Sequence, residues 1–283
     1  MSNLKNKIYN LIVEASTRMP EDVVSALDSA LTSEELAGNT SAADRIKLML
    51  ENIRLAKQNR LPLCQDTGLI NFYIDAPPGT DREAFEAAAE SAVIKATSEG
   101  LLRSNSVCPI TGKNTGNNIG TGTPSFYWNE TGGTFRCRLM LKGGGSENVC
   151  SQYALPDTGL DAERNLEGVE KCILDAVKKA GGKGCPPSVI SVCIGGDRAS
   201  GYTAAKKAIF RKIGERSTNP ELAEFEKAML KKVNSLNIGP MGLGGKTTAL
   251  DLFITALNRH PASFFVTVSF ICWSCRRAET TIG

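Results

Sequence analysis

The chain has 283 residues, 41% of them hydrophobic and 22% charged, and its 33 lysines and arginines nearly balance 30 aspartates and glutamates. This composition predicts an ordinary globular core and gives no reason to expect a nucleic acid or an anionic membrane as partner. Because no run approaches the roughly 18 apolar residues of a membrane helix and no signal-peptide core follows the N-terminus, we expect a cytoplasmic protein.

The first sixty residues carry helical patterns only. Apolar residues recur at helical spacing over residues 4–16, and proline followed by two acids predicts a second helix from Pro20. A capping-box pattern predicts a third helix from Ser41, and Pro62 ends this region. We therefore expect residues 1–60 to form a helical layer.

Strand patterns begin directly after this layer. Residues 69–74 read as a strand, and Thr80 is expected to cap an alanine-rich helix. Residues 125–128 and 134–140 predict a hairpin, closed by a Thr-Gly-Gly turn between them. The second of these strands alternates apolar and charged residues, which predicts one buried face.

The C-terminal half continues to mix the two kinds of element. A helix with inward apolar residues is expected to end at Gly181, and a buried strand follows over residues 189–194. Further helices are predicted over residues 203–212 and from Pro220 to Gly239, and the alternation over residues 264–270 predicts the last strand.

Helices and strands alternate without a repeat or an obvious linker. We therefore predict an α/β (mixed α+β) fold, in which the N-terminal helical layer precedes mixed β-sheets with flanking helices. The expected organisation is one domain over residues 1–283, with a helical layer at 1–60 and a mixed α/β part at 61–283 that would carry the functional site.

Nine cysteines without a secretion signal predict reduced thiols rather than a disulfide framework. Three of them, Cys137, Cys172 and Cys193, lie in apolar patterns and are expected to fill the core. Three others, Cys64, Cys185 and Cys272, lie in loops at the ends of elements, where a thiolate can reach a metal cluster.

These three cysteines do not occur in the close pairs of a ferredoxin or a zinc knuckle, so their spacing alone leaves core, redox and metal roles open. Cys272 and Cys275 have C-x-x-C form, but no second pair completes a zinc site. Residues 239–247 resemble a phosphate-binding loop but carry proline where its first glycine belongs, so we expect no nucleotide site.

Six short motifs occur together and in order. The chain thereby resembles the α subunit of two-subunit class I fumarate hydratases and of the related L(+)-tartrate dehydratases. The motifs are Cys-Gln-Asp-Thr-Gly at 64–68, Asn-Thr-Gly at 114–116, Lys-Gly-Gly-Gly-Ser at 142–146, Cys-Pro-Pro at 185–187, Arg-His-Pro-Ala at 259–262 and Cys-Trp-x-x-Arg-Arg at 272–277.

This resemblance implies that Cys64, Cys185 and Cys272 ligate three irons of a [4Fe-4S] cluster, whose fourth iron is free to bind substrate oxygens. It also implies that the cluster serves as a Lewis acid. Asp66 and His260, the only histidine of the chain, match the positions of an acid/base pair. The alternative, purely structural roles are those of a loop aspartate that accepts hydrogen bonds from backbone amides and of a histidine that stabilises a turn.

The resemblance further implies that Gln65, Arg103 and the backbone of Gly145 bind the carboxylates or hydroxyl of a small dicarboxylic acid. It implies a separate β subunit, a heterotetramer of two α and two β chains, and an α chain that is inactive alone. The expected reaction is hydration of fumarate to L-malate. The alternatives are an L(+)-tartrate dehydratase α subunit, a non-catalytic iron–sulfur sensor or assembly subunit, and a zinc-stabilised binding module.

Overall fold

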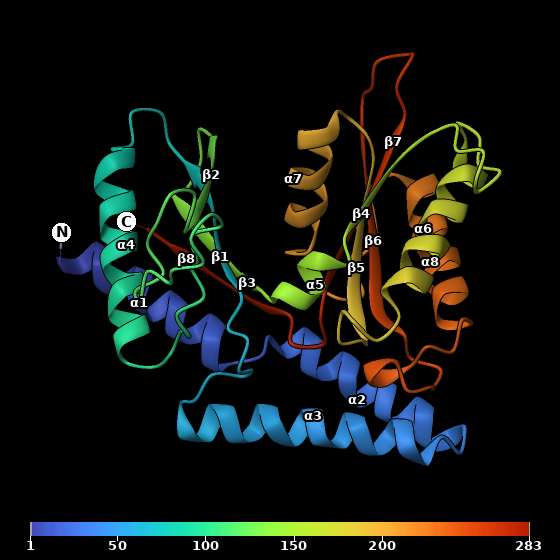
Figure 1. Ribbon diagram of the computed structural model, residues 1–283, viewed down its shortest axis with the longest axis horizontal. Helices are drawn as coiled ribbons and strands as arrows, with labels where there is room; N and C mark the ends of the chain where they lie inside the picture. Colours follow the sequence, from blue (N-terminus) through green and yellow to red (C-terminus); the bar gives the residue numbers. More distant parts are fainter. Residues whose placement is uncertain (1, 283) are drawn as a thin grey trace. The chain divides into compact units, whose positions relative to one another are not determined.

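The computed structural model describes residues 2–282, and it confirms a mixed α/β protein with two separate four-stranded sheets (Figure 1). The chain divides into two compact units. Unit 1 consists of Met1–Pro20, Glu51–Gly144 and Ser274–Gly283, and unit 2 consists of Glu21–Leu50 and Gly145–Trp273. Because each unit is assembled from several segments, no linker marks the division in the sequence.

Unit 1 is a four-stranded sheet with helices packed on it. Its strands lie in the order β2-β1-β3-β8, where β2 runs parallel to β1 and the other neighbours are antiparallel. The hydrophobic core joins the sheet to α1 and α4 through residues such as Ile12, Phe72, Phe85 and Leu139. The elements are α1 (Ser2–Thr17), β1 (Leu69–Ala76), α4 (Arg82–Ser98), β2 (Ser125–Glu130), β3 (Arg136–Lys142) and β8 (Arg276–Thr281).

The predicted hairpin of residues 125–128 and 134–140 is wrong, because β1 lies between β2 and β3. The crossover through α4 places β2 parallel to β1, and β3 then returns along the other edge of β1. An alternating pattern identifies a strand but not its neighbour. The cap of α4 is also one residue later than predicted, since Asp81 rather than Thr80 accepts the amide of Ala84.

Unit 2 contains the second sheet, with strands in the order β4-β7-β5-β6. Strands β5 and β6 are parallel, whereas β7 is antiparallel to both β5 and β4. The elements are α2 (Glu21–Leu36), α5 (Gly144–Asn148), β4 (Ser151–Ala154), α6 (Leu166–Ala180), β5 (Ser188–Gly195), α7 (Arg198–Ala208), α8 (Pro220–Asn234), the short 3-10 helix η1 (Pro240–Gly242), β6 (Ala249–Leu257) and β7 (Phe265–Ile271). Helix α3 (Thr40–Asn59) contributes residues to both units.

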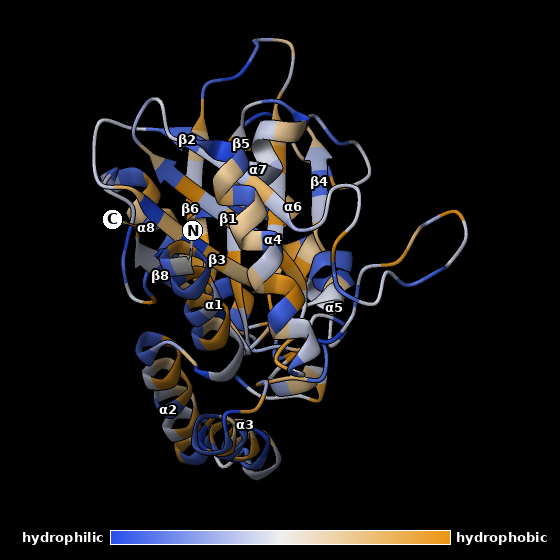
Figure 2. Cartoon of the chain, turned by 90° about the vertical axis from the view of Figure 1, so that its left-hand side faces the viewer, coloured by the Kyte–Doolittle hydropathy of each residue, from blue (hydrophilic) through white to orange (hydrophobic). Residues whose placement is uncertain are grey.

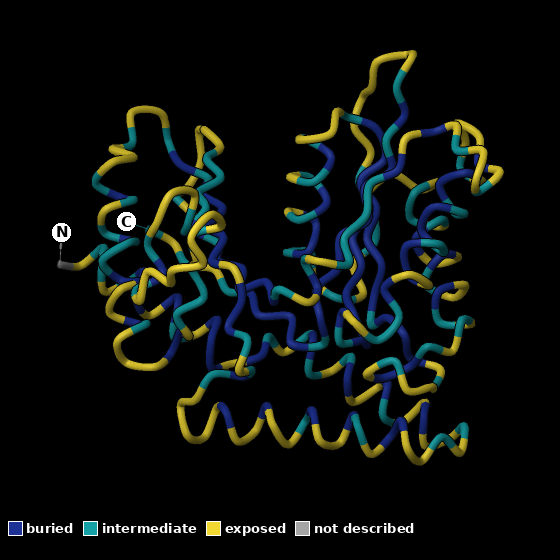
Figure 3. The backbone as a smooth tube through the Cα atoms, viewed as in Figure 1, coloured by how far each residue is buried: buried dark blue, intermediate teal, exposed yellow. Residues whose placement is uncertain are grey.

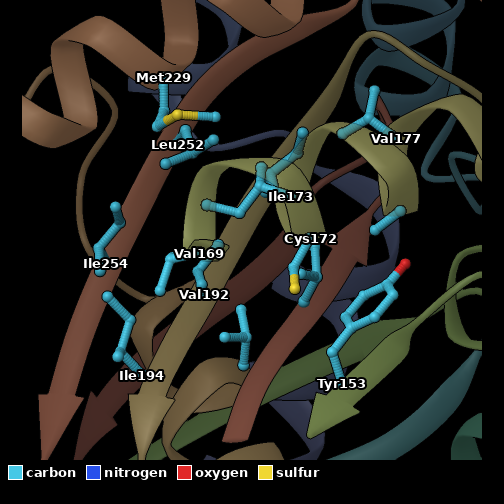
Figure 4. Packing of buried hydrophobic residues seen from close by; sticks show 14 of the residues in the cluster. Tyr153, Val169, Cys172, Ile173, Val177, Val192, Ile194, Met229, Leu252 and Ile254 are labelled. Atoms are coloured by element: carbon cyan, nitrogen blue, oxygen red, sulfur yellow. The ribbon is translucent and has the colours of Figure 1, made fainter. Parts of the chain in front are cut away.

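Helices cover both faces of the second sheet, with α6 and α8 on one face and α7 on the other (Figure 1). The core under α6 and α8 includes Ile173, Val192, Met229 and Leu252 (Figure 4). The inner strands β5 and β7 of this sheet are mostly hydrophobic, as the apolar runs of the sequence predict (Figure 2). They are also almost entirely buried, as the dark blue strands of this sheet in Figure 3 show.

The bounds of α7, the end of α8 and the identity of the last strand differ from the prediction. Helix α7 covers Arg198–Ala208 rather than 203–212, because Asp197 forms a capping box with Ser200. Helix α8 begins at Pro220 as predicted but ends at Asn234, before Gly239. Strand β7 is not the last, since β8 follows it in unit 1.

Among the described residues, no helix is both long enough and apolar enough to cross a membrane.

Candidate functional site

The loop that carries Cys64 is fixed in unit 1 by the backbone of the preceding residue. The amide of Leu63 donates to the Ser16 carbonyl over 2.9 Å, and the Asn52 side chain donates to the Leu63 carbonyl over 2.8 Å. Cys64 itself is half-buried, and Gln65 is exposed. The chain therefore presents the thiol and the amide from an anchored position.

Asp66 uses both carboxylate oxygens to accept backbone amides. Oδ1 accepts from Gly68 over 2.9 Å, and Oδ2 accepts from Gly144 over 2.7 Å. The second bond brings the motif at 64–68 to the glycine run at 142–146. The bonding of loop amides is the ordinary structural role of such an aspartate, and it also fixes the direction of the carboxylate.

Two glycines permit this close approach. Gly68 has a φ of +87°, and a Cβ there would lie 2.7 Å from the backbone of Lys142. A Cβ on Gly143 would lie 3.1 Å from Oδ2 of Asp66. Larger residues would push β3 and the Asp66 loop apart.

Arg103 is tied to the same loop through its backbone. Its amide donates to Thr67 Oγ1 over 3.0 Å, and buried Asn118 donates to the Arg103 carbonyl over 2.9 Å. The Arg103 side chain is exposed, and its guanidinium makes no hydrogen bond or ion pair with the residues that the structure describes. Unit 1 thus groups Cys64, Gln65, Asp66 and Arg103 on two connected loops.

Cys185 and Cys272 lie beyond the same end of the two inner strands, β5 and β7, of the sheet in unit 2. The antiparallel register pairs Val189 with Ile271, so the start of β5 meets the end of β7. The amide of Trp273 donates to the Cys185 carbonyl over 3.1 Å, which joins the two cysteine loops directly. Cys272 is 8% exposed and Cys185 is half-buried.

The glycine-rich loop at 239–245 braces the Cys185 loop. The Met241 amide donates to the Pro186 carbonyl over 2.7 Å. A Cβ on Gly242 would lie 2.3 Å from Cα of Gly182, so the two backbones are in contact. Cys185 has a φ of +52°, an uncommon conformation for a residue with a side chain, and this packing holds it.

Gly145 lies at the start of α5, beside a cavity of about 330 Å³ whose lining includes Asn148, Lys179 and Lys183. It is exposed, and a Cβ there would lie 3.0 Å from the Lys183 carbonyl. The cavity lies wholly within unit 2 and carries two lysines, which suits a negatively charged molecule.

His260 is exposed in the connection between β6 and β7. Its Nδ1 accepts the Ala262 amide over 3.1 Å, which is the turn-stabilising role considered above. Cys272 lies at the other end of β7, and seven residues of extended chain span roughly 23 Å. Within unit 2 the structure therefore does not bring His260 to Cys272.

Among residues 2–282, no group of three or more His, Cys, Asp and Glu side chains is placed to hold a metal ion. Two of the three predicted ligands lie beyond the same strand ends in unit 2, and Cys64 belongs to unit 1. The joint role of the three cysteines stays a prediction.

Sequence reasoning missed a buried arginine beside Asp66. Arg276 is 1% exposed, and its Nη1 donates to the Asp66 carbonyl over 2.6 Å. Its neighbour on the adjacent strand, Lys142, is also fully buried. The available signal was the pair of arginines four and five residues after Cys272, in the last of the six motifs.

The three cysteines predicted to fill the core do so. Burial raises the pKa of the Cys137 and Cys172 thiols to about 12 and that of Cys193 to about 11. Cys172 lies on the buried face of α6, beside Val169, Ile173 and Tyr153 (Figure 4). Protonated thiols in such surroundings are poor ligands and poor nucleophiles.

Comparison with known proteins points to one family. The sequence model described as fumarate hydratase (Fumerase) matches residues 5–281. A Geobacillus stearothermophilus protein provisionally named fumarate hydratase class I is 43% identical over 98% of this chain, which spans only 54% of that relative's length.

Two further relatives are similar in length to this chain. A Methanocaldococcus jannaschii protein provisionally named L(+)-tartrate dehydratase subunit alpha is 37% identical, and the match covers 97% of this chain and 96% of that protein. The L(+)-tartrate dehydratase subunit alpha of Escherichia coli O157:H7 is 32% identical over 100% of this chain and 91% of its own length.

Proposed function

Because this chain belongs to the fumarate hydratase (Fumerase) family, we propose that it is the cluster-binding α subunit of an iron–sulfur hydro-lyase. The proposed reaction is the reversible addition of water to fumarate, which gives L-malate. The cytoplasm is its proposed location.

The observation that carries this proposal is the junction of the Cys185 and Cys272 loops. A hydrogen bond of 3.1 Å from Trp273 to Cys185 and the β5–β7 register hold two thiol-bearing backbones beyond the same end of these strands. Neither cysteine belongs to an apolar core pattern, unlike Cys137, Cys172 and Cys193. This arrangement suits presentation of thiolates to a shared group.

The donor set fits an iron–sulfur cluster. Cys64, Cys185 and Cys272 would hold it, and thiolates are the ligands that such clusters take from proteins. Arg276, a buried cation beside the Cys64 loop, favours a negatively charged group there. When bound, a [4Fe-4S] cluster with one iron free of cysteine supplies a Lewis acid for the substrate hydroxyl.

Asp66 is the proposed proton carrier, and two amide bonds hold its carboxylate in a fixed direction. General acid/base catalysis requires such a fixed group close to the carbon that gains or loses the proton. Arg103 has an exposed guanidinium suited to bidentate binding of a substrate carboxylate. Gln65 and the Gly145 amide are the further proposed contacts, and His260 is the second proposed acid/base.

A separate β subunit is the proposed partner, in a heterotetramer of two α and two β chains. The names of two relatives, each given as a subunit alpha, support this. The α chain without the β subunit is expected to be inactive.

L(+)-tartrate dehydration is the second candidate, and the two relatives named as subunit alpha support it. Fumarate takes precedence because the relative with 43% identity carries the fumarate hydratase name. A non-catalytic iron–sulfur sensor or assembly subunit is a third reading, and the retention of Asp66 and Arg103 beside Cys64 argues against it. The last alternative is a zinc-stabilised binding module.

The test is anaerobic purification of this chain co-expressed with its β subunit, followed by absorbance assays on fumarate, L-malate and L-tartrate. A brown complex that interconverts fumarate and malate is the expected result. Turnover of tartrate alone would assign the second candidate, and a brown, inactive complex would favour the sensor. A colourless protein after cluster reconstitution would overturn the iron–sulfur proposal and favour zinc.

A further inference from the structure

Arg276 begins β8 directly beside the loops that carry Asp66 and Cys64. It pairs with Leu141 across the sheet, and Lys142, Gly143 and Gly144 follow Leu141. Arg276 therefore lies opposite the end of β3, where the glycine run meets Asp66. All of these residues belong to unit 1.

The guanidinium holds the main chain of Asp66, whereas two amides hold its side chain. Nη1 of Arg276 donates to the Asp66 carbonyl over 2.6 Å. A Cβ on Gly143 would lie 3.1 Å from Asp66 Oδ2 and 3.6 Å from Arg276 Nη2, so the three residues pack directly on one another. The peptide group between Asp66 and Thr67 cannot rotate while Arg276 holds its oxygen.

The Asp66 carboxylate packs near the Arg276 guanidinium, but it accepts two backbone amides and forms no ion pair with Arg276. The Arg276 side chain is 1% exposed, and within residues 2–282 its one hydrogen-bond acceptor is a neutral carbonyl oxygen. Its Nε is buried without a hydrogen-bond partner among those residues. Burial of a guanidinium that forms no ion pair carries a substantial desolvation cost. A neutral glutamine could donate to one carbonyl at a lower desolvation cost, so loop anchoring alone does not explain the arginine.

We propose that Arg276 is a positioning residue that fixes the Cys64–Asp66 loop and supplies the positive charge for an anionic group bound at that loop. The inference rests on the proposed function, in which the anionic group is the thiolate-ligated cluster or the substrate dicarboxylate. Arg276 does not touch the reacting atoms in this scheme. It acts through its hydrogen bond to the Asp66 carbonyl and through the electrostatic field of its positive charge.

The experiment compares Arg276→Met and Arg276→Lys in the cluster-loaded αβ complex. Arg276→Met removes both the charge and the hydrogen bond, whereas Arg276→Lys keeps the charge but loses the planar guanidinium and its several N–H donors. Arg136→Met is the matched control, since Arg136 is an exposed arginine on β3 of the same sheet. The readouts are iron and sulfide per chain, kcat, KM and the midpoint potential of the cluster from an EPR-monitored titration.

For Arg276→Met we expect kcat to fall roughly 10- to 100-fold, the usual loss when a residue that orients a metal ligand or its loop is replaced. A lower midpoint potential would assign the charge to the cluster, because a nearby cation favours the reduced, more negative form. A raised KM at unchanged potential would assign it to the dicarboxylate. Arg276→Lys should keep potential and KM near wild type and lose part of kcat.

Wild-type kcat, KM and potential in Arg276→Met would overturn the inference. The inference would also be overturned if both Arg276 variants lost cluster and folded structure equally while the chains that remain loaded kept an unchanged potential. Arg276 would then have only a structural role. If Arg276→Met does not fold, Arg276→Lys alone decides through its kcat loss at unchanged KM. An inactive, colourless wild-type complex would instead refute the proposed function.

Discussion

The backbone amide of Trp273 donates to the carbonyl of Cys185 over 3.1 Å, so two cysteines that are distant in sequence are held on adjacent loops. The bond lies beyond the last pair of the β5–β7 ladder, Val189 with Ile271, and joins the two loops that leave it. The positive φ of Cys185 shows that the loop takes a conformation its side chain disfavours. A structural role for the thiol in the core would not require this.

Cys185→Ser and Cys272→Ser are expected to lose the cluster while the chain stays folded. Serine preserves the size of each side chain but is a poor ligand for iron in a sulfur cluster. The measurements are iron and acid-labile sulfide per chain and circular dichroism. Cys193→Ala is the control: it should retain iron and lose only roughly 1–2 kcal/mol of stability, because its thiol fills the core. Full iron content in Cys272→Ser would exclude it as a ligand.

Asp66→Asn should reduce kcat roughly 100- to 10,000-fold at constant cluster content, the range for loss of a general acid/base. Asparagine can keep the acceptor for Gly68 but turns a donor toward the Gly144 amide, which also weakens the loop contact. His260→Gln should lose less, since His260 lies at the other end of β7 from Cys272. The comparison uses kcat normalised to iron. A larger loss in His260→Gln would make His260 the main proton carrier.

Gly143→Ala should lower kcat about tenfold while the melting temperature changes little, because small misplacements of a catalytic group are costly. The added Cβ would lie 3.1 Å from Asp66 Oδ2, so the carboxylate must shift slightly. Gly132→Ala is the matched control, since a Cβ there meets no atom within 4 Å. Equal kcat in the two variants would show that the position of this carboxylate does not limit the reaction.

Much of the fold was predictable from local signals. The Asn219-Pro220 cap of α8, the continuous strand β5 and the glycine end of α6 all arise from residues within a few positions of one another. Strand β6 was not predicted, because it carries Asp251 near its start. That carboxylate is 1% exposed and accepts from the Gly214 amide and Arg216, partners that no local pattern reveals.

The candidate site shows the same division. Loop settings and family motifs made Cys64, Asp66, Cys185 and Cys272 candidate site residues, but they did not predict which loops would touch. The Asp66–Gly144 and Trp273–Cys185 bonds depend on strand order and register, which are tertiary properties. Arg276 escaped notice because a charged residue reads as exposed until the packing around it is known.

Glu34→Gln should lower the free energy of unfolding by about 1–3 kcal/mol at pH 7, since it weakens a buried, charge-assisted set of hydrogen bonds. Burial alone would raise the pKa of Glu34, but hydrogen bonds from Asn39 and from the amides of Lys246 and Thr247 hold it below its usual value. The stabilisation is therefore fully present above the ordinary glutamate pKa and is lost as the pH falls through the folded-state value.

The check is urea denaturation of wild type and Glu34→Gln at pH 7 and near pH 3. The difference between the two proteins should shrink toward the lower pH. Glu35→Gln is the control, because its side chain is exposed on the same helix and should change stability by less than about 0.5 kcal/mol. A difference that grows as the pH falls would contradict the lowered pKa.

Cys108 should be the fastest of the non-ligand cysteines to react with iodoacetamide at pH 8. Hydrogen bonds from the Thr111 side chain and from the amides of Thr111 and Ile110 lower its thiol pKa, and the residue is only half-buried. Cys137 and Cys172 have pKa values of about 12, so alkylation of Cys108 should be on the order of 100-fold faster. Mass spectrometry of the timed reaction gives the rates. Thr111→Val should slow Cys108 alone, and an unchanged rate would mean that the Thr111 hydroxyl does not stabilise the thiolate.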